Sequence, residues 1–147
     1  MVRTFPPIRT RPMSRSDFPA ISVIEGQCYH HILTEEEYRK FFLQNDTGGI
    51  VAEIDGQVVA YMFFSYKLKY ISLLAIAVDP RFRHKSIGTQ LVNKLKSKLE
   101  PGLYNYIRAD VAETNLRTQL FLKKCGFFCT ETINKKDDTY YMFQYYV

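Results

Sequence analysis

Residues 71–92 constrain the fold of this chain more than any other segment. Ile71–Val78 is an almost unbroken apolar run, and Pro80 ends it. A basic stretch, Arg81–Lys85, then leads into a helical spacing of apolar residues that starts at Ile87. An apolar run of this kind is typical of a strand covered on both faces. The segment therefore predicts a buried strand, a basic loop and the start of a helix in direct succession.

A connection of this type is suited to binding a diphosphate. The first backbone N–H groups of a helix have no partner within the helix, and the helix dipole adds partial positive charge there. Gly88 permits close approach of the backbone, and Arg83, His84 and Lys85 add countercharge. The same residues also fit a plain strand–loop–helix connection with a basic surface, and by themselves they leave both interpretations open.

The sequence before this segment predicts a strand, two helices and a hairpin. Ile8–Met13 is a short strand pattern, and Pro12 places it at a sheet edge or a strand end. Ser14–Asp17 and Thr34–Glu37 each combine a capping hydroxyl with an acid three residues later, which is a common way for a helix to begin. Asp55-Gly56 lies between two apolar runs and predicts a two-residue hairpin turn, because both central residues need a positive φ.

The sequence after the segment predicts two helices and three strands. In chain order these are a helix from Ile87 to a stop at Pro101-Gly102, a strand at Asn105–Ala112, a helix capped by Thr114 or Asn115 and ended by Gly126, and a closing hairpin of Phe127–Ile133 with Thr139–Val147. The order of elements is β-α-α-β-β-β-α-β-α-β-β. We therefore expect residues 1–147 to form one mixed α/β (α+β) domain.

The composition is that of a globular protein and does not select a partner. Of the 147 residues, 46% are hydrophobic and 24% are charged. The formal net charge of +5 and the pI of about 9.1 favour anionic ligands such as phosphates, acidic peptides or nucleic acid. Lys94, Lys96 and Lys98 are spread around the expected helix, and no nucleic-acid-binding motif accompanies them. We therefore expect no nucleic-acid partner.

The cysteines and the N-terminus indicate the compartment. Cys28, Cys125 and Cys129 are odd in number and lack the paired spacing of a zinc site or a disulfide framework. Met1–Pro12 contains no apolar signal-peptide region, and no apolar run is long enough to span a membrane. We therefore expect a cytoplasmic protein without a bound metal and without membrane association.

The basic loop and two later segments share a pattern with one known family. Arg83–Gly88 follows the pattern Q/R-x-x-G-x-G/A except at Ser86, and Ile76–Pro80 precedes it as a strand and an exit turn. Asp110–Asn115 and Cys125–Phe127 follow at the expected places. Together these segments resemble the GNAT superfamily of N-acetyltransferases, and the central region is most similar to its RimI-like branch. The resemblance implies a central, mostly antiparallel twisted sheet of about six to seven strands flanked by about four helices.

This resemblance implies an acetyl-CoA-dependent N-acetyltransferase. Acetyl-CoA would be the co-substrate, and its acetyl group would pass directly to a primary amine in a ternary complex. The acceptor would be a peptide N-terminus or a small-molecule amine, and the protein a monomer or a homodimer. The residues implied to bind the cofactor are Ile76, Ala77, Val78, Arg83, His84, Lys85, Ser86, Ile87, Gly88, Thr89 and Asn115.

The resemblance also implies a catalytic base. Asp110 stands where RimI-like enzymes carry one, and Glu113 is a neighbouring alternative. A carboxylate has a reference pKa of about 4 and is a weak base toward an ammonium group. Asp110 would therefore need burial or a relaying water to act as a base. An ordinary aspartate at the end of a strand is the other interpretation.

Two positions depart from the family pattern. Ser86 replaces the first glycine of the loop, which weakens cofactor binding if that position needs a positive φ. Leu122 stands where the family usually has the tyrosine that protonates the departing thiolate, and Tyr140 and Tyr141 are possible substitutes. A general acid typically contributes about 10²–10⁴-fold to a rate. Leu122 therefore supports an alternative function, a non-catalytic acyl-CoA-binding or sensor domain of the same fold.

The acceptor is left open by the sequence. Tyr29, His30 and His31 lie where the family lines its acceptor site, and histidines there suit a proton relay or are simply solvated. Residues 29–34 and 134–140 carry no pattern that identifies the amine.

Overall fold

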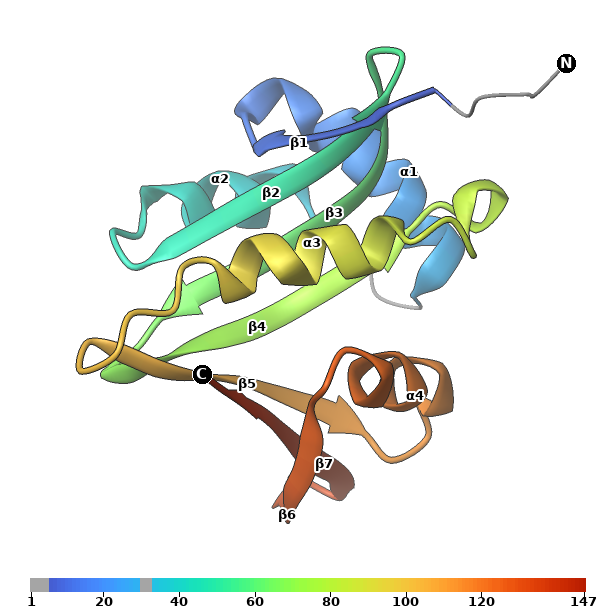
Figure 1. Cartoon of the computed structure of the whole chain (residues 1–147). Coiled ribbons are helices and arrows are strands. Elements are labelled where there is room, and N and C mark those ends of the chain that lie inside the picture. Colours follow the sequence, from blue (N-terminus) through green and yellow to red (C-terminus); the bar gives the residue numbers. More distant parts are fainter. Residues whose placement is uncertain (1–5, 30–32) are drawn as a thin grey trace, which may run out of the picture. The chain divides into compact units, whose positions relative to one another are not determined.

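The chain forms a seven-stranded sheet with the strand order β1-β2-β3-β4-β5-β7-β6 (Figure 1). The computed structural model describes residues 6–29 and 33–147. The sheet, and the four α-helices within those residues, confirm the expected mixed α/β fold. The strands are β1 (Ile8–Pro12), β2 (Thr47–Ile54), β3 (Gln57–Tyr66), β4 (Lys69–Val78), β5 (Tyr104–Ala112), β6 (Phe128–Lys135) and β7 (Asp138–Tyr146), and the helices are α1 (Phe18–Cys28), α2 (Glu35–Leu43), α3 (Ile87–Lys96) and α4 (Leu116–Lys124).

The strand pairing combines antiparallel pairs with a parallel pair. β1 with β2, β5 with β7 and β6 with β7 run antiparallel. β4 and β5 run parallel, which requires a crossover, and α3 lies between them in the sequence. β2 and β3 are joined by the expected turn, in which Asp55 and Gly56 have φ of 51° and 79°. Positive φ at both positions matches the twist of the two strands.

The chain divides into two compact units. The first contains the described residues up to Phe63 together with Ala75–Leu91, and the second contains Phe64–Leu74 with Val92–Val147. Consequently β3, β4 and α3 each run from one unit into the other.

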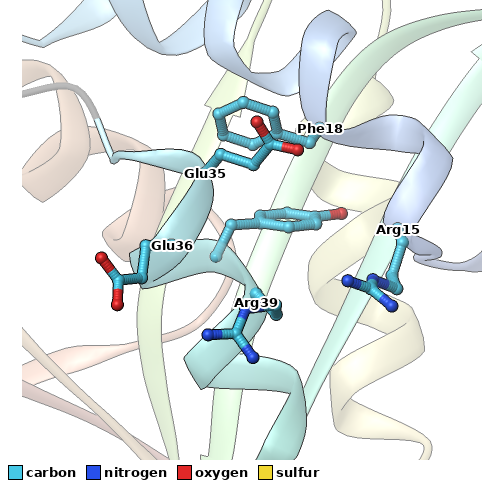
Figure 2. A pocket seen from close by; sticks show the side chains of 6 residues that line it. Arg15, Phe18, Glu35, Glu36 and Arg39 are labelled. Atoms are coloured by element: carbon cyan, nitrogen blue, oxygen red, sulfur yellow. The ribbon is translucent and has the colours of Figure 1, made fainter.

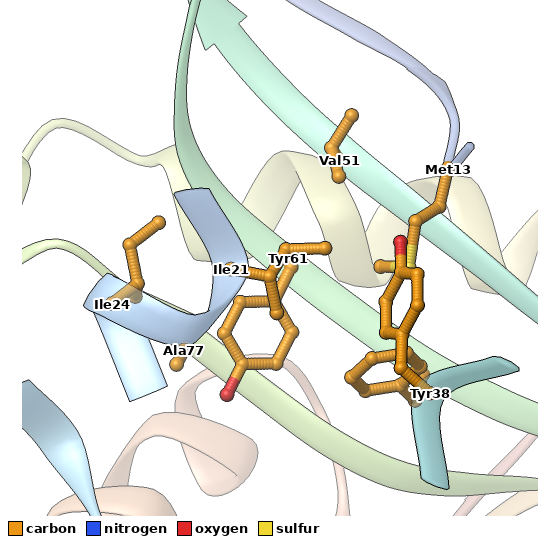
Figure 3. Close-up of a cluster of buried hydrophobic side chains, with 8 residues drawn as sticks. Met13, Ile21, Ile24, Tyr38, Val51, Tyr61 and Ala77 are labelled. Atoms are coloured by element: carbon orange, nitrogen blue, oxygen red, sulfur yellow. The ribbon is translucent and has the colours of Figure 1, made fainter. Parts of the chain in front are cut away.

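The core of the first unit joins α1 and α2 to strands β2, β3 and β4. Ile21 and Ile24 of α1 and Tyr38 of α2 are buried, and the Tyr38 hydroxyl donates to the Ser14 carbonyl at 2.6 Å. The hydroxyl therefore keeps a partner inside the core. The cluster comprises Met13, Ile21, Ile24, Tyr38, Val51, Tyr61, Phe63 and Ala77 (Figure 3).

Ala77 brings the end of β4 into this core. Ala75 packs partly against the same cluster. Because side chains alternate along a strand, those of Ile76 and Val78 point to the opposite face of β4.

The core of the second unit is formed by β5, β7 and α4. Ile107 of β5, Phe143 of β7 and Leu122 of α4 are buried. The buried Gln119 side chain of α4 donates to two carbonyl oxygens at the end of β5, those of Ala112 and Glu113, each at 3.0 Å. These bonds fix the start of α4 against the strand that precedes it.

Strand β6 is an edge of the sheet. All of its residues except Ile133 are exposed, and its pairing with β7 shifts register between Cys129 and Glu131. A row of stacked rings crosses from β4 to this edge, with centroid distances of 5.1, 5.0 and 6.1 Å between successive rings. The rings are those of Tyr70, Tyr106, Tyr146 and Phe128.

Strand β2 begins earlier than the sequence indicates. The apolar pattern starts at Ile50, but the strand starts at Thr47. Before Ile50, the Gly49 carbonyl accepts from the Met13 N–H at 2.9 Å. Gly49 also packs closely against Met13, because a Cβ atom there would lie 2.7 Å from Met13 Sδ and would require the Met13 side chain to shift.

Helix α2 begins with the expected capping box. Thr34 Oγ1 accepts from the Glu37 N–H at 3.1 Å, and Glu37 Oε1 accepts from the Thr34 N–H at 3.0 Å. The Thr34→Ala substitution should lower the free energy of unfolding by about 1 kcal/mol, because an N–H group of the first turn loses its acceptor. Urea denaturation measures this change. Thr34→Ser keeps the acceptor and should stay close to the parent protein, and equal stability of the alanine and serine variants would contradict the cap.

Candidate active site

Strand β4 contains one more residue than the stretch of β3 beside it. At one end the Lys67 N–H donates to the Tyr70 carbonyl at 2.8 Å, and at the other the Asp79 N–H donates to the Val59 carbonyl at 2.8 Å. Between these two hydrogen bonds, the β3 side advances eight residues, from Val59 to Lys67. The β4 side advances nine, from Tyr70 to Asp79. The extra residue is a β-bulge in β4. In the part of β4 that follows the bulge, each peptide group points to the other edge of the strand than it would without the extra residue.

The peptide groups of Ile76 and Val78 therefore point to the edge of β4 that faces away from β3. Peptide groups alternate along a strand, and that of Asp79 faces β3. Two side chains from the end of α1 bind at the far edge: Tyr29 Oη donates to the Ile76 carbonyl at 2.7 Å, and Cys28 Sγ to the Val78 carbonyl at 3.7 Å. These contacts place the bulge before Ile76. The pairing of β4 with β5 covers only Lys69–Ser72.

A rigid turn follows β4. The Asp79 carboxylate is buried, accepts from the Arg81 N–H at 3.0 Å and pairs with the Arg81 guanidinium at 2.8 Å. The Arg81 hydrogen bonds outweigh burial and lower the pKa of Asp79 below its usual range. Pro80 begins a short 3₁₀ turn, Pro80–Phe82. The apolar run therefore ends at Val78, as the sequence predicted, and the exit of the loop is held by a buried charge.

The loop between this turn and α3 contains two residues in the left-handed region. His84 has φ of 64° and Ser86 has φ of 63°. Such a conformation is strained for residues other than glycine, by about 1–2 kcal/mol each. Ser86 thus replaces glycine at a position where the backbone does require a positive φ, which is the condition under which the sequence predicts a cost.

Helix α3 offers donors at its first turn. Its first intrahelical bond runs from the Gln90 N–H to the Ser86 carbonyl at 3.0 Å. The N–H groups of Ile87, Gly88 and Thr89 consequently have no acceptor within the helix. Ile87 is buried and anchors the turn, whereas Gly88 and Thr89 are half-buried. This arrangement of donors suits an anion such as a phosphate.

Arg83 connects the loop to the end of α1. Its Nη2 lies 3.3 Å from Cys28 Sγ. Within the first unit the structure therefore brings together residues 76–78, the loop and the first turn of α3, together with Cys28 and Tyr29. The sequence assigned Tyr29 only to the acceptor side, and it held no signal for the contacts of Tyr29 and Cys28 with β4.

Asp110 lies in the second unit and is held by two cations. Its Oδ1 accepts from Arg108 Nε at 2.9 Å, and its Oδ2 accepts from Arg108 Nη2 at 3.1 Å and from Lys135 Nζ at 2.7 Å. Burial alone would raise the pKa of Asp110, but the hydrogen bonds from the two cations outweigh it and the pKa is lowered. The carboxylate is therefore ionised at neutral pH and is a weaker base than an isolated aspartate.

Asn115 and Leu122 belong to α4 in the same unit. Asn115 is the N-cap of the helix, and its Oδ1 accepts from the Thr118 N–H at 3.2 Å. Its side-chain N–H₂ group keeps donors for another partner. Leu122 is fully buried. The position that the resemblance compares with a catalytic tyrosine is thus filled by an aliphatic core residue.

A separate hollow of about 480 Å³ opens beside the starts of α1 and α2 (Figure 2). None of the residues expected to bind the cofactor or to act in catalysis lines it. Its lining comprises Arg15, Phe18, Glu35, Glu36, Tyr38 and Arg39.

Three further expectations from the sequence concern the histidines, a bound metal and the membrane. His30 and His31, considered as a proton relay, lie outside the described residues. Within residues 6–29 and 33–147, no group of three or more histidine, cysteine, aspartate or glutamate side chains could hold a metal ion. In that same part of the chain, every helix is too short or too polar to cross a bilayer.

Comparison with known proteins identifies the family. The model of the acetyltransferase (GNAT) family matches residues 18–127, which include β4, the basic loop, α3, β5 and α4. An uncharacterized N-acetyltransferase of Methanocaldococcus jannaschii is 27% identical over 118 residues, which cover 80% of this chain and 76% of that protein. The chain belongs to the GNAT family of acetyltransferases.

Solved structures share the fold at lower identity. The ribosomal-protein-S18-alanine N-acetyltransferase of Escherichia coli superposes with a TM-score of 0.79 at 17% identity, over 93% of this chain and 92% of that one. Arabidopsis thaliana NAA60 in complex with acetyl-CoA superposes with a TM-score of 0.81 at 17% identity, over 96% of this chain and 99% of that one.

The left-handed conformation of Ser86 generates a stability prediction. Ser86→Gly should raise the free energy of unfolding by up to about 1 kcal/mol, because the relief of strain exceeds the added entropy of the unfolded chain. Ser86→Val should lower it by about 1 kcal/mol or more, since a β-branched residue is poorly tolerated at positive φ. Urea denaturation of both variants provides the measurement. A valine variant as stable as the glycine variant would show that residue 86 does not adopt this conformation.

Proposed function

We propose that this chain transfers the acetyl group of acetyl-CoA to a primary amine, either a protein N-terminus or a small-molecule amine, in a ternary complex. The main support for the proposal is the order in which candidate cofactor-binding groups follow one another along the chain in the first unit. The outward-facing peptide groups of Ile76 and Val78 lead into a loop with two left-handed residues and then into the open first turn of α3. Membership of the acetyltransferase family supports the chemistry.

Acetyl-CoA fits these groups part by part. Its extended pantetheine arm carries amides that can bind the edge of β4 at residues 76–78 in the way that a neighbouring strand would. Its diphosphate matches the N–H groups of Ile87, Gly88 and Thr89, with countercharge from Arg83. His84, Lys85 and Ser86 form the loop between these two parts. We propose Asn115 as a further contact through its side-chain N–H₂ group.

The acceptor is proposed at the level of a class. The similarity of the central segment to the RimI-like branch, and the shared fold with the Escherichia coli enzyme, favour a protein N-terminus. A small-molecule amine remains the second candidate within the same reaction.

The chain's own residues are proposed to contribute to the chemistry in two ways. Acetyl-CoA supplies an activated acetyl group when bound. A backbone N–H at Ile76 or Val78 can stabilise charge that develops on the acetyl oxygen, and a backbone donor loses no side-chain entropy in doing so. The attacking amine must be neutral, and we propose Asp110 as the group that takes its proton. Because its pKa is lowered, Asp110 is a poor base for direct transfer, and a relaying water fits its role better.

The departing thiolate has no tyrosine partner at position 122. A thiol ionises at a pH of about 8.5, so the thiolate of coenzyme A is a tolerable leaving group without an acid. The expected result is slower turnover. The buried aliphatic Leu122 also favours a second candidate, a domain that binds acyl-CoA without turning it over.

Release of free thiol from acetyl-CoA in the presence of an amine panel tests the proposal. Gly88→Asp should abolish turnover and raise the dissociation constant for coenzyme A at least about tenfold, since a carboxylate at the first turn of α3 repels the diphosphate and fills its place. Calorimetry measures the binding. Asn93→Asp adds the same charge at an exposed position on α3 and serves as the matched control. Coenzyme A binding that is equal in both variants would refute the diphosphate position.

Binding without thiol release from any amine would instead support the acyl-CoA-binding candidate. Failure of the parent protein to bind coenzyme A would contradict both functions.

Asp110→Asn separates catalysis from binding. If Asp110 relays the proton, kcat should fall by about 10²-fold or more, while the dissociation constant for coenzyme A should change little. Steady-state kinetics across pH 6–9 and calorimetry provide the two measurements. Glu113→Gln removes the neighbouring carboxylate. A larger fall of kcat in the Glu113 variant would move the base to that residue.

A further inference from the structure

The end of α1 holds the backbone acceptors that the proposed function assigns to the pantetheine arm. Tyr29 follows the last residue of the helix, and its N–H still bonds to the Glu25 carbonyl at 2.8 Å. Its phenol crosses to β4 and donates to the Ile76 carbonyl at 2.7 Å. Partial burial raises the pKa of Tyr29 to about 12, so the hydroxyl stays protonated and remains a donor throughout the neutral range.

Cys28 makes the second contact at the same edge. Its half-buried Sγ lies 3.7 Å from the Val78 carbonyl and 3.3 Å from Arg83 Nη2. The residue thus connects the second edge acceptor of β4 to the cation of the loop. Two successive side chains therefore bind the carbonyls of two alternate strand residues.

These contacts engage the two carbonyls that a bound chain would need. A strand-edge carbonyl accepts from a neighbouring extended chain roughly in the plane of the sheet, and the peptide groups of Ile76 and Val78 point away from β3 along that direction. An amide N–H of an extended ligand paired at this edge would approach the same oxygen atoms. The phenol of Tyr29 and the thiol of Cys28 already donate to those oxygen atoms.

We propose that Tyr29 and Cys28 take the place of the pantetheine arm in the cofactor-free protein and are displaced when acetyl-CoA binds. This inference rests on the proposed function, because it needs the cofactor at the edge of β4. Displacement requires free energy and therefore lowers the observed affinity for the cofactor.

Tyr29→Phe tests the displacement through binding rather than turnover. Titration calorimetry with coenzyme A should show binding about 2–10-fold tighter than in the parent protein, which corresponds to one net hydrogen bond that no longer has to be broken. The urea midpoint of the cofactor-free variant should fall, because the same bond is lost there. Cys28→Ala should act in the same direction with a smaller effect, since a thiol is a weaker donor. Tyr146→Phe removes an exposed phenol of β7, which donates to Gln144, and should leave coenzyme A affinity unchanged.

The opposite signs of the two effects distinguish displacement from a merely structural role. Tighter binding combined with lower cofactor-free stability supports the inference. Unchanged or weaker binding in Tyr29→Phe, with the parent protein binding coenzyme A normally, overturns it while leaving the proposed function intact. A parent protein that does not bind coenzyme A overturns both. If Tyr29→Phe does not fold, the Cys28→Ala titration decides by the same criteria.

Discussion

The extra residue in β4 is the constraint on which the candidate site depends. In a regular strand, the peptide groups of Ile76 and Val78 would face β3 and form hydrogen bonds with it. The bulge turns them to the other edge while Ala77 still packs into the core between α1 and the sheet. One strand thus supplies a core side chain at Ala77 and outward-facing backbone groups at the two adjacent residues, Ile76 and Val78. A site built from backbone atoms of a buried strand is well fixed in position, because the strand cannot move without disturbing the core.

The strained loop is tolerated because both of its ends are anchored. On one side, the buried Asp79 carboxylate binds the Arg81 backbone and guanidinium. On the other, Ile87 and Leu91 of α3 are buried, which holds the first turn of the helix in place. Between these anchors the backbone can keep His84 and Ser86 in a conformation that neither residue prefers. The strain is thus stored in the loop that we propose to lie against the diphosphate of the cofactor.

The sequence specified the elements well because their ends carry local signals. The Thr34 cap, the Asp55-Gly56 turn and the Asn115 cap each act within a few residues, and all three are present in the structure. The bulge carried no such signal, because the apolar residues of β4 are interchangeable in a pattern analysis. Contacts between distant residues were equally hidden: Tyr29 and Ile76 are 47 positions apart.

Asp110 illustrates the same limit at the level of chemistry. The motif identified the residue, but its basicity depends on Lys135, which is 25 positions away and belongs to the strand β6. A pairing of this length is set by the sheet and not by neighbouring residues. Motifs therefore nominated candidate side chains such as Asp110, whereas tertiary structure determined their charge state and hydrogen bonds.

The exposed strand β6 has a consequence for how the protein behaves at high concentration. An edge strand presents unpaired N–H and C=O groups that can recruit a strand of another molecule. Here the register shift between Cys129 and Glu131 interrupts the regular ladder, and Glu131 and Lys135 place charges along the same strand. A distorted and charged edge is a poor template for strand addition. The irregular register of β6 and its charged residues therefore protect this edge of the sheet from the addition of a strand of another molecule.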